Sequence, residues 1–210
     1  MVAEVCRKAK ENLNAIAFAS EEDMNKMLRA AADALRARAE YIIAENKKDI
    51  AVCTRGAQFV DRLMLDVKRI DGIAAGLEKL IELRCPVGEV LEERTLYNSI
   101  SLRRVRVPLG VLGIIYEARP NVTADAIGLS IKSGNAVVLR GSKDAILSNK
   151  AVTKVIKEAI AAAGYNPEFI QLIEDTTHEG ATQFMRMNGV IDVLNFAPQP
   201  TVLPLEPDRI

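Results

Sequence analysis

The sequence contains few cysteines, a single histidine and no tryptophan, and these scarce residues form no recognisable chemical motif. Its three cysteines are odd in number and far apart, which argues against a disulfide framework and favours reduced thiols in the cytoplasm. None of them stands at a metal-ligand spacing from His178. We therefore expect neither a disulfide-bonded secreted fold nor a metal site.

The sequence also lacks an excess of charge of either sign, since 28 Lys and Arg residues balance 28 Asp and Glu residues. This balance gives no electrostatic reason to expect nucleic acid or an anionic membrane as a partner. No apolar run approaches the roughly 20 residues of a membrane-spanning helix, and the first residues lack the apolar stretch of a secretory signal. Because 49% of the 210 residues are hydrophobic, the chain can bury a core of one or two domains.

The most informative stretch, residues 104–140, predicts a strand, a helix and a second strand in succession. The first strand is Val- and Ile-rich and punctuated by glycine, which is typical of a strand buried on both faces. The predicted segments are a strand over 110–116, a polar turn over 117–121, a helix over 122–132, a Ser-Gly-Asn stop over 133–135, a strand over 136–139 and a basic turn over 140–143. The two strands should be parallel, with a ligand held by the turns at their ends.

The first 85 residues are predicted to be helical because apolar residues recur along them at helical spacing. Ser20 and Asp66 are placed to cap helices. The predicted segments are a helix over 3–18, a long helix over about 21–46, a connector or short helix over 49–61 and a helix over 67–83. We interpret these helices as scaffold.

Residues 86–108 are predicted to be extended. Over 98–107, apolar residues alternate with arginines and serines, which indicates a half-exposed strand with a basic face. The arginines could form a phosphate-binding patch, but a solvated or subunit-facing edge strand is the commoner explanation.

Strands and helices continue to alternate after the central unit. The predicted segments are a helix over 148–163 capped by Ser148 and stopped by Gly164, a strand over 169–173, a helix over 179–187 and a strand over 190–194. This order predicts an α/β fold with an open, mostly parallel sheet, flanking helices and preceding N-terminal helices. Residues 195–210 hold four of the eight prolines and are predicted to be a divergent tail.

The turn over 140–143 is the best candidate for a phosphate site. Gly141 lets the backbone approach a ligand, while Arg140 and Lys143 can neutralise a phosphate beside Ser142. A dinucleotide with a 2′-phosphate would suit this charge, so NADP is favoured over NAD. The alternative is that both cations are ordinary surface residues. The usual dinucleotide fingerprint, G-x-G-x-x-G, is absent.

Two segments, VPLGVLGIIYEARPNVTADA and KSGNAVVLRGSKDA, resemble the gamma-glutamyl phosphate reductases, also called glutamate-5-semialdehyde dehydrogenases, of the aldehyde dehydrogenase superfamily. The run from Tyr116 to Thr123 is the most family-specific piece. The likeness covers residues 1–194 and only the first half of such an enzyme. It implies an incomplete Rossmann-like cofactor domain with a helical lead-in over 1–85, extended strands over 86–108 and alternating elements over 109–194.

The resemblance implies an NADPH-dependent reduction of gamma-glutamyl phosphate to glutamate-5-semialdehyde and phosphate, in proline biosynthesis. The family needs a cysteine thiolate as nucleophile, and Cys6, Cys53 and Cys85 do not match that position. The catalytic domain would then be absent and this chain inactive alone. His178 is expected to be exposed or to cap a helix. Strands beside the cofactor domain contribute to oligomer contacts in the superfamily, so the resemblance is compatible with a homo-oligomer.

The resemblance also implies roles for residues around the central turn. Ile115 and Tyr116 would line the nicotinamide side, and Arg140 would reach the adenine ribose. The residues that would face the substrate are Glu117, Arg119 and Asn121. Either Glu117 or Asn121 would stabilise the oxyanion. Two other functions stay open, a non-catalytic nucleotide-binding or subunit-pairing fragment and another acylating aldehyde dehydrogenase. The Glu-Ala-Arg-Pro-Asn turn counts against the latter, because the wider superfamily typically has a Trp-Asn-containing turn there.

Overall fold

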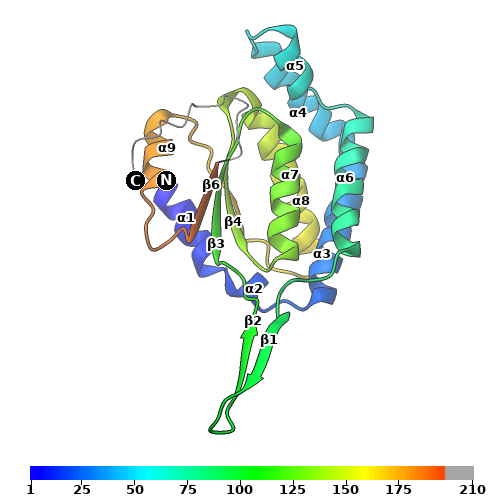
Figure 1. Cartoon of the computed structure of the whole chain (residues 1–210). Coiled ribbons are helices and arrows are strands. Elements are labelled where there is room, and N and C mark those ends of the chain that lie inside the picture. Colours follow the sequence, from blue (N-terminus) through cyan, green and yellow to red (C-terminus); the bar gives the residue numbers. More distant parts are fainter. Residues whose placement is uncertain (197–210) are drawn as a thin grey trace.

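The computed structural model describes residues 1–196 and contains an open parallel sheet covered by helices on both faces (Figure 1). The strand order is β5-β4-β3-β6. The strands are β3 (Val111–Ile115), β4 (Ala136–Arg140), β5 (Ile170–Leu172) and β6 (Val193–Phe196). All three pairings in this sheet are parallel. The predicted α/β fold is confirmed.

The central strand-helix-strand unit forms as predicted. Helix α7 (Pro120–Lys132) begins with Pro120, whose fixed φ and missing N–H suit the first helical position. It ends before Gly134, which adopts a φ of +70°. Strand β4 is fully buried from Ala136 to Leu139. Strand β3 is less buried than expected, because only Val111 and Gly113 are fully buried along it.

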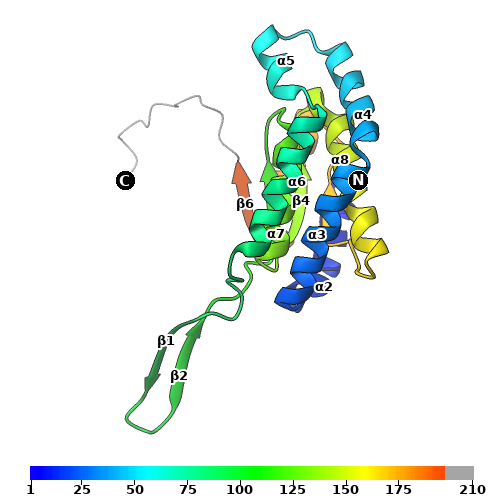
Figure 2. The same ribbon diagram turned by 90° about the vertical axis from the view of Figure 1, so that its right-hand side faces the viewer.

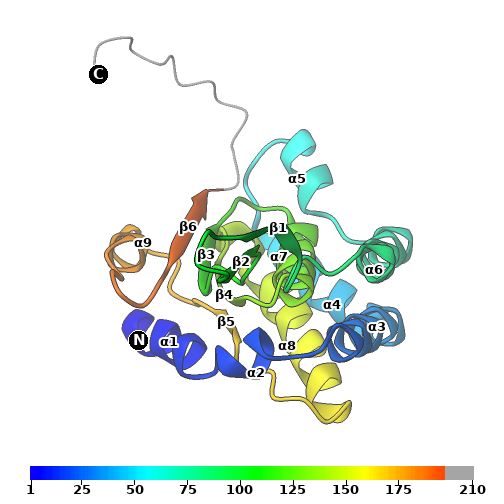
Figure 3. The same cartoon turned by 60° about the horizontal axis from the view of Figure 1, so that its bottom comes forward.

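Helices cover the two faces of the sheet unequally (Figure 3). One face of the sheet carries α1 (Val2–Glu11) and α9 (His178–Met185), and the other carries α7 and α8 (Ile146–Ala162). An outer layer packs against α7 and α8. It consists of α3 (Glu21–Ala37), α4 (Ala39–Val52) and α6 (Val67–Glu82). Within residues 1–196, no helix combines the length and the apolar character needed to cross a membrane.

Two helices predicted as continuous are each broken in two. The predicted helix 3–18 stops at Asn12, whose side-chain amide donates to the Lys8 carbonyl at 2.8 Å, and resumes as α2 (Asn14–Ala17). The predicted helix 21–46 breaks at Arg38. Both α3 and α4 pack against α8, and α3 also packs against α6.

The predicted caps at Ser20 and Asp66 are confirmed. The Ser20 hydroxyl accepts from the Asp23 amide at 3.1 Å, and the Asp66 carboxylate accepts from the Arg69 amide at 2.7 Å. The connector or short helix predicted over 49–61 is only partly correct, because α4 continues to Val52 and the short helix α5 (Ala57–Leu63) follows it.

The predicted cap at Ser148 is wrong, because α8 already begins at Ile146, after the 3-10 turn η1 (Lys143–Ala145). Ser148 is buried inside the helix, and Asp49 of α4 takes the capping role. The Asp49 carboxylate accepts from the Leu147 amide at 3.2 Å, the Ser148 amide at 2.7 Å and the Ser148 hydroxyl at 2.6 Å. A side chain from a distant helix thus supplies the acceptor that the local sequence was expected to provide.

Residues 86–108 form a projecting hairpin (Figure 2). Its strands, β1 (Val90–Thr95) and β2 (Ser101–Val105), pair antiparallel and are exposed along their whole length, so the expected half-burial is wrong. Arg103 pairs with Glu93 at 2.8 Å and Arg104 with Glu92 at 3.7 Å. These cross-strand ion pairs neutralise the basic face, which argues against a phosphate patch.

Strand β6 lies further along the chain than predicted. Val190 and Ile191 pack against the core from a turn, and the strand begins only at Val193. Asn195 and Phe196, predicted to start the tail, therefore belong to the sheet, paired with Ile114 and Ile115. The rest of the predicted tail, 197–210, lies outside the described residues.

Candidate functional site

A cleft of about 850 Å³ opens where β3 and β4 end. The carboxyl ends of parallel strands are the usual binding edge of an open α/β sheet. The cleft brings together all six residues predicted to bind the cofactor, as well as Glu117. Its lining residues are Arg55, Phe59, Ile115, Tyr116, Glu117, Ala118, Arg140, Gly141, Ser142, Lys143, Thr176, Thr177, His178 and Phe196.

Tyr116 forms a buried wall of this cleft. Its hydroxyl lies 2.8 Å from the Thr123 hydroxyl, which donates to the Asn149 side-chain oxygen at 2.9 Å. Because the Thr123 proton is used toward Asn149, the Tyr116 hydroxyl donates to Thr123. Burial raises the pKa of the Tyr116 phenol, so it stays neutral.

Gly141 must be glycine because of its close packing. A Cβ at this position would lie 2.2 Å from the Asn149 Nδ2 atom and 3.2 Å from the Tyr116 ring. Both neighbours are buried and held by hydrogen bonds, so neither can move aside easily. The predicted role of Gly141 was close approach to a ligand. The structure places its tightest contact on the protein side.

Three cations surround the cleft. Arg140 donates to the Thr177 carbonyl at 2.7 Å, and its buried Nε atom has no partner among the described residues. Burial lowers the Arg140 pKa, against the opposing effect of nearby Asp175. Lys143 is exposed and has no ion pair within the described part of the chain.

Arg55 is the third cation, and sequence reasoning missed it together with Phe59. The Arg55 guanidinium lies 4.4 Å from the centre of the Phe59 ring and pairs with Asp144 at 3.2 Å. The Arg55-Gly56 turn indicates only where α4 ends. No local signal shows that this turn reaches a cleft formed by residues far along the chain.

The residues predicted to face the substrate are divided between two pockets. Glu117 lines the cleft, whereas Arg119 and Asn121 line a second pocket of about 490 Å³ beside α5, α6 and α7. Ala118, between them, is buried against Leu63 and Ala145. The segment 117–121, a turn that enters α7 at Pro120 rather than at the predicted residue 122, therefore has one pocket on each side. Sequence reasoning missed the other charged residues of the second pocket, which are Asp61, Arg62, Arg69 and Asp125.

None of the three cysteines is among the residues that line either pocket. Cys6 is buried, and burial raises its thiol pKa to about 11, which keeps it protonated and unreactive. Cys53 and Cys85 are partly buried, and neither lines a pocket. His178 is exposed at the first position of α9 and lines the cleft, while the cap of that helix is Thr177. Within residues 1–196, no group of acidic, histidine and cysteine side chains is arranged to hold a metal.

An aldehyde dehydrogenase family model matches residues 1–198. The chain belongs to this family. It is 47% identical over 191 residues to a gamma-glutamyl phosphate reductase of Bacillus anthracis (strain CDC 684 / NRRL 3495), covering 90% of this chain and 46% of that protein. The crystal structure of gamma-glutamyl phosphate reductase from Thermotoga maritima superposes with a TM-score of 0.92 at 33% identity, over 95% of this chain and 49% of that one.

The corresponding Saccharomyces cerevisiae structure has a TM-score of 0.83 at 30% identity, over 92% of this chain and 50% of that one. The chain thus spans about half the length of the relatives it matches. The resemblance found in the sequence is confirmed at the level of the family.

Proposed function

We propose that the chain is the cofactor-binding part of a gamma-glutamyl phosphate reductase, which reduces gamma-glutamyl phosphate with NADPH in proline biosynthesis. Its similarity to reductases of that name supports this proposal. The observation that carries the cofactor assignment is the cleft at the ends of β3 and β4, where three cations converge. Residues 1–194 would form the cofactor domain, with a helical lead-in over 1–85, the hairpin region over 86–108 and alternating elements over 109–194.

The cleft fits a phosphorylated dinucleotide in size and in charge. Its volume of about 850 Å³ lies within the range typical of ligand sites. The unpartnered Nε atom of Arg140 is a buried donor, which is costly unless a ligand supplies an acceptor. We assign the 2′-phosphate to Arg140, Ser142 and Lys143. Ile115 and Tyr116 would border the nicotinamide.

NADPH, when bound, supplies the hydride for the reduction. The residues of this chain bind and orient it. The Tyr116 hydroxyl already donates to Thr123, so Tyr116 acts as a wall that excludes water rather than as an acid. The thiolate chemistry implied by the family requires a cysteine. Since none of the three cysteines lines the cleft, we propose that this chain binds the cofactor without turning over.

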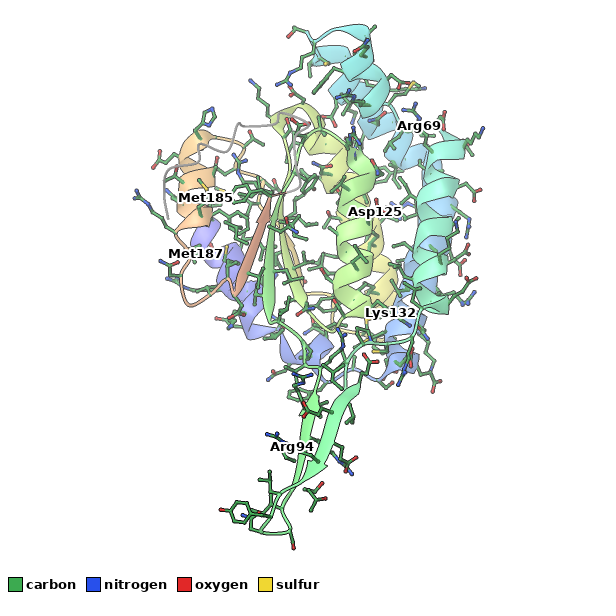
Figure 4. The ribbon with its side chains drawn as sticks, in the orientation of Figure 1. Arg69, Arg94, Asp125, Lys132, Met185 and Met187 are labelled. Carbon is green, nitrogen blue, oxygen red and sulfur yellow. The ribbon has the colours of Figure 1, made fainter. Side chains whose placement is uncertain are left out.

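Calorimetric titration of NADPH and NADH into the chain tests the cofactor assignment. A hydrogen bond to a charged group contributes about 1.5–3 kcal/mol, so NADPH should bind about tenfold or more tightly than NADH. Arg140→Ala should remove this preference. The matched control is Arg94→Ala, an exposed arginine on β1 at a distance from the cleft (Figure 4).

Equal affinity for NADPH and NADH in the parent chain would refute the assignment of the 2′-phosphate. Failure of both nucleotides to bind would favour the alternative that the chain is a subunit-pairing fragment.

A further inference from the structure

The second pocket, of about 490 Å³, has mixed charge. It lies between the segment connecting α5 to α6 and the first turns of α7, with Arg69 on α6 and Asp125 on α7 (Figure 4). Arg69 is already engaged, because its guanidinium donates to Asp61 Oδ1 and to the Met64 carbonyl, both at 2.8 Å. Arg69 therefore holds the wall of the pocket.

Two other guanidinium groups line the pocket without such partners. Arg62 and Arg119 are exposed, and neither forms an ion pair with a described residue. Arg62 comes from α5 and Arg119 from the residue before α7, so separate elements bring two cations to one pocket. An anionic group of a ligand would find two donors there that match a carboxylate in geometry.

Asp125 places a carboxylate in the same pocket. It is partly buried, and its only hydrogen bond among the described residues comes from the Asn121 amide at 3.3 Å. No described cation lies within 4.0 Å of it. Burial raises the Asp125 pKa, against the lowering effect of the Asn121 hydrogen bond. A partly buried carboxylate without a cation is unfavourable in the free protein and is suited to a cationic ligand group.

We propose that this pocket binds the α-amino-acid head group of the substrate, with the α-ammonium on Asp125 and the α-carboxylate on Arg62 or Arg119. This inference rests on the proposed reductase function. A pocket for the phosphate end would require cations alone, and Asp125 would repel that group. One carboxylate beside two guanidinium groups instead complements a zwitterion.

The position of the pocket agrees with this orientation. Gamma-glutamyl phosphate carries its zwitterion at one end and its reacting acyl phosphate at the other. The turn 117–121 separates the two pockets, with Glu117 on the cofactor cleft and Asn121 on the second pocket. A substrate held by its head group in the second pocket would direct its acyl end toward the cleft.

Nuclear magnetic resonance titration of the full chain with L-glutamate 5-methyl ester tests the proposal. This probe has the zwitterionic head group and a neutral far end. On its own it is expected to bind with an affinity of about 1 mM. The amides of Asn121 and Gly72, two residues that line the pocket, should shift saturably. The N-acetyl derivative, which lacks the ammonium, should bind at least tenfold more weakly.

Asp125→Asn should lower the affinity for the ester at least tenfold and abolish the discrimination against the N-acetyl derivative. The matched control is Asp33→Asn, an exposed carboxylate on α3, which should leave both affinities unchanged. A purely structural role predicts that Asp125→Asn destabilises the fold. Burial raises the Asp125 pKa, so the fold favours the protonated carboxyl group and loses stability as pH rises and this group ionises. Asp125→Asn, which stays neutral, should therefore be more stable than the parent chain at neutral pH.

Equal binding of the two probes, an unchanged affinity in Asp125→Asn, or no saturable shift up to about 10 mM ester would overturn the inference. Inorganic phosphate displacing the ester at equal concentration would do so as well, because it would mark an anion site. Titration with NADPH separates the two proposals. If the parent chain binds NADPH but not the ester, the head-group site alone is overturned. If the parent chain does not bind NADPH, the cofactor site is overturned.

Discussion

Asp49→Ala should destabilise the protein more than any surface substitution, because Asp49 caps α8 from another helix. Its side chain is buried, at 2% exposure, and accepts hydrogen bonds from the Leu147 amide, the Ser148 amide and the Ser148 hydroxyl. Each buried donor that loses its acceptor costs about 1–3 kcal/mol. The three donors share one site and can partly reorganise, so we expect a loss of roughly 3–5 kcal/mol in the free energy of unfolding.

Urea unfolding followed by circular dichroism measures this loss by linear extrapolation. Asp49→Asn keeps one acceptor oxygen and should lose less than Asp49→Ala. The control, Asp33→Ala, alters an exposed carboxylate and should stay within about 0.5 kcal/mol of the parent chain. A double-mutant cycle with Ser148→Ala should give a coupling energy of about 0.5–3 kcal/mol.

The capping argument would be refuted by a loss in Asp49→Ala below about 1 kcal/mol. A coupling energy near zero would show that the hydroxyl of Ser148 and the carboxylate act independently. A loss below that value would mean that α8 begins where it does for reasons other than Asp49.

Four further predictions concern packing and charge. Gly141→Ala should lower the free energy of unfolding by about 1–3 kcal/mol in chemical unfolding, because the new Cβ atom has no room. Gly72→Ala lies in open space within α6 and should raise the free energy of unfolding by about 0.5–1 kcal/mol. Burial raises the Glu168 pKa, but hydrogen bonds with Lys8, Lys157 and Gln171 outweigh this effect and lower the pKa to about 2. The stabilising contribution of the Glu168 carboxylate is therefore present above pH 4.5 and is lost as pH falls toward 2. Glu168→Gln should flatten acid unfolding curves over that range. Lys132→Met should cost about 1–3 kcal/mol in thermal unfolding, because the buried ammonium donates to Glu21 at 3.1 Å and Asn25 at 2.9 Å, and an unchanged midpoint would contradict this.

The elements with local chemical signals could be predicted from the sequence. Ser20 caps α3 because its acceptor and donor lie three residues apart. Gly134 and Gly164 end helices because they adopt φ of +70° and +89°. The failure at Ser148 has a different origin, since its partner, Asp49, lies 99 residues earlier and no local pattern reports on it.

The same distinction applies to the site. Arg140 to Lys143 could be predicted because residues that follow a buried parallel strand reach the binding edge of the sheet. Arg55 and Phe59 could not, because a separate connection brings them to the cleft. The separation of Glu117 from Arg119 depends on the burial of Ala118, which only the folded turn reveals.

The hairpin of β1 and β2 has a consequence for the dynamics of the chain. A two-stranded ribbon without a core is marginally stable in water, and every residue of both strands is exposed. Its ladder can open without disturbing the sheet, so its amide hydrogens should exchange with solvent through local opening long before those of β4. The chain should therefore consist of at least two cooperative units, with the hairpin as the one of lower stability.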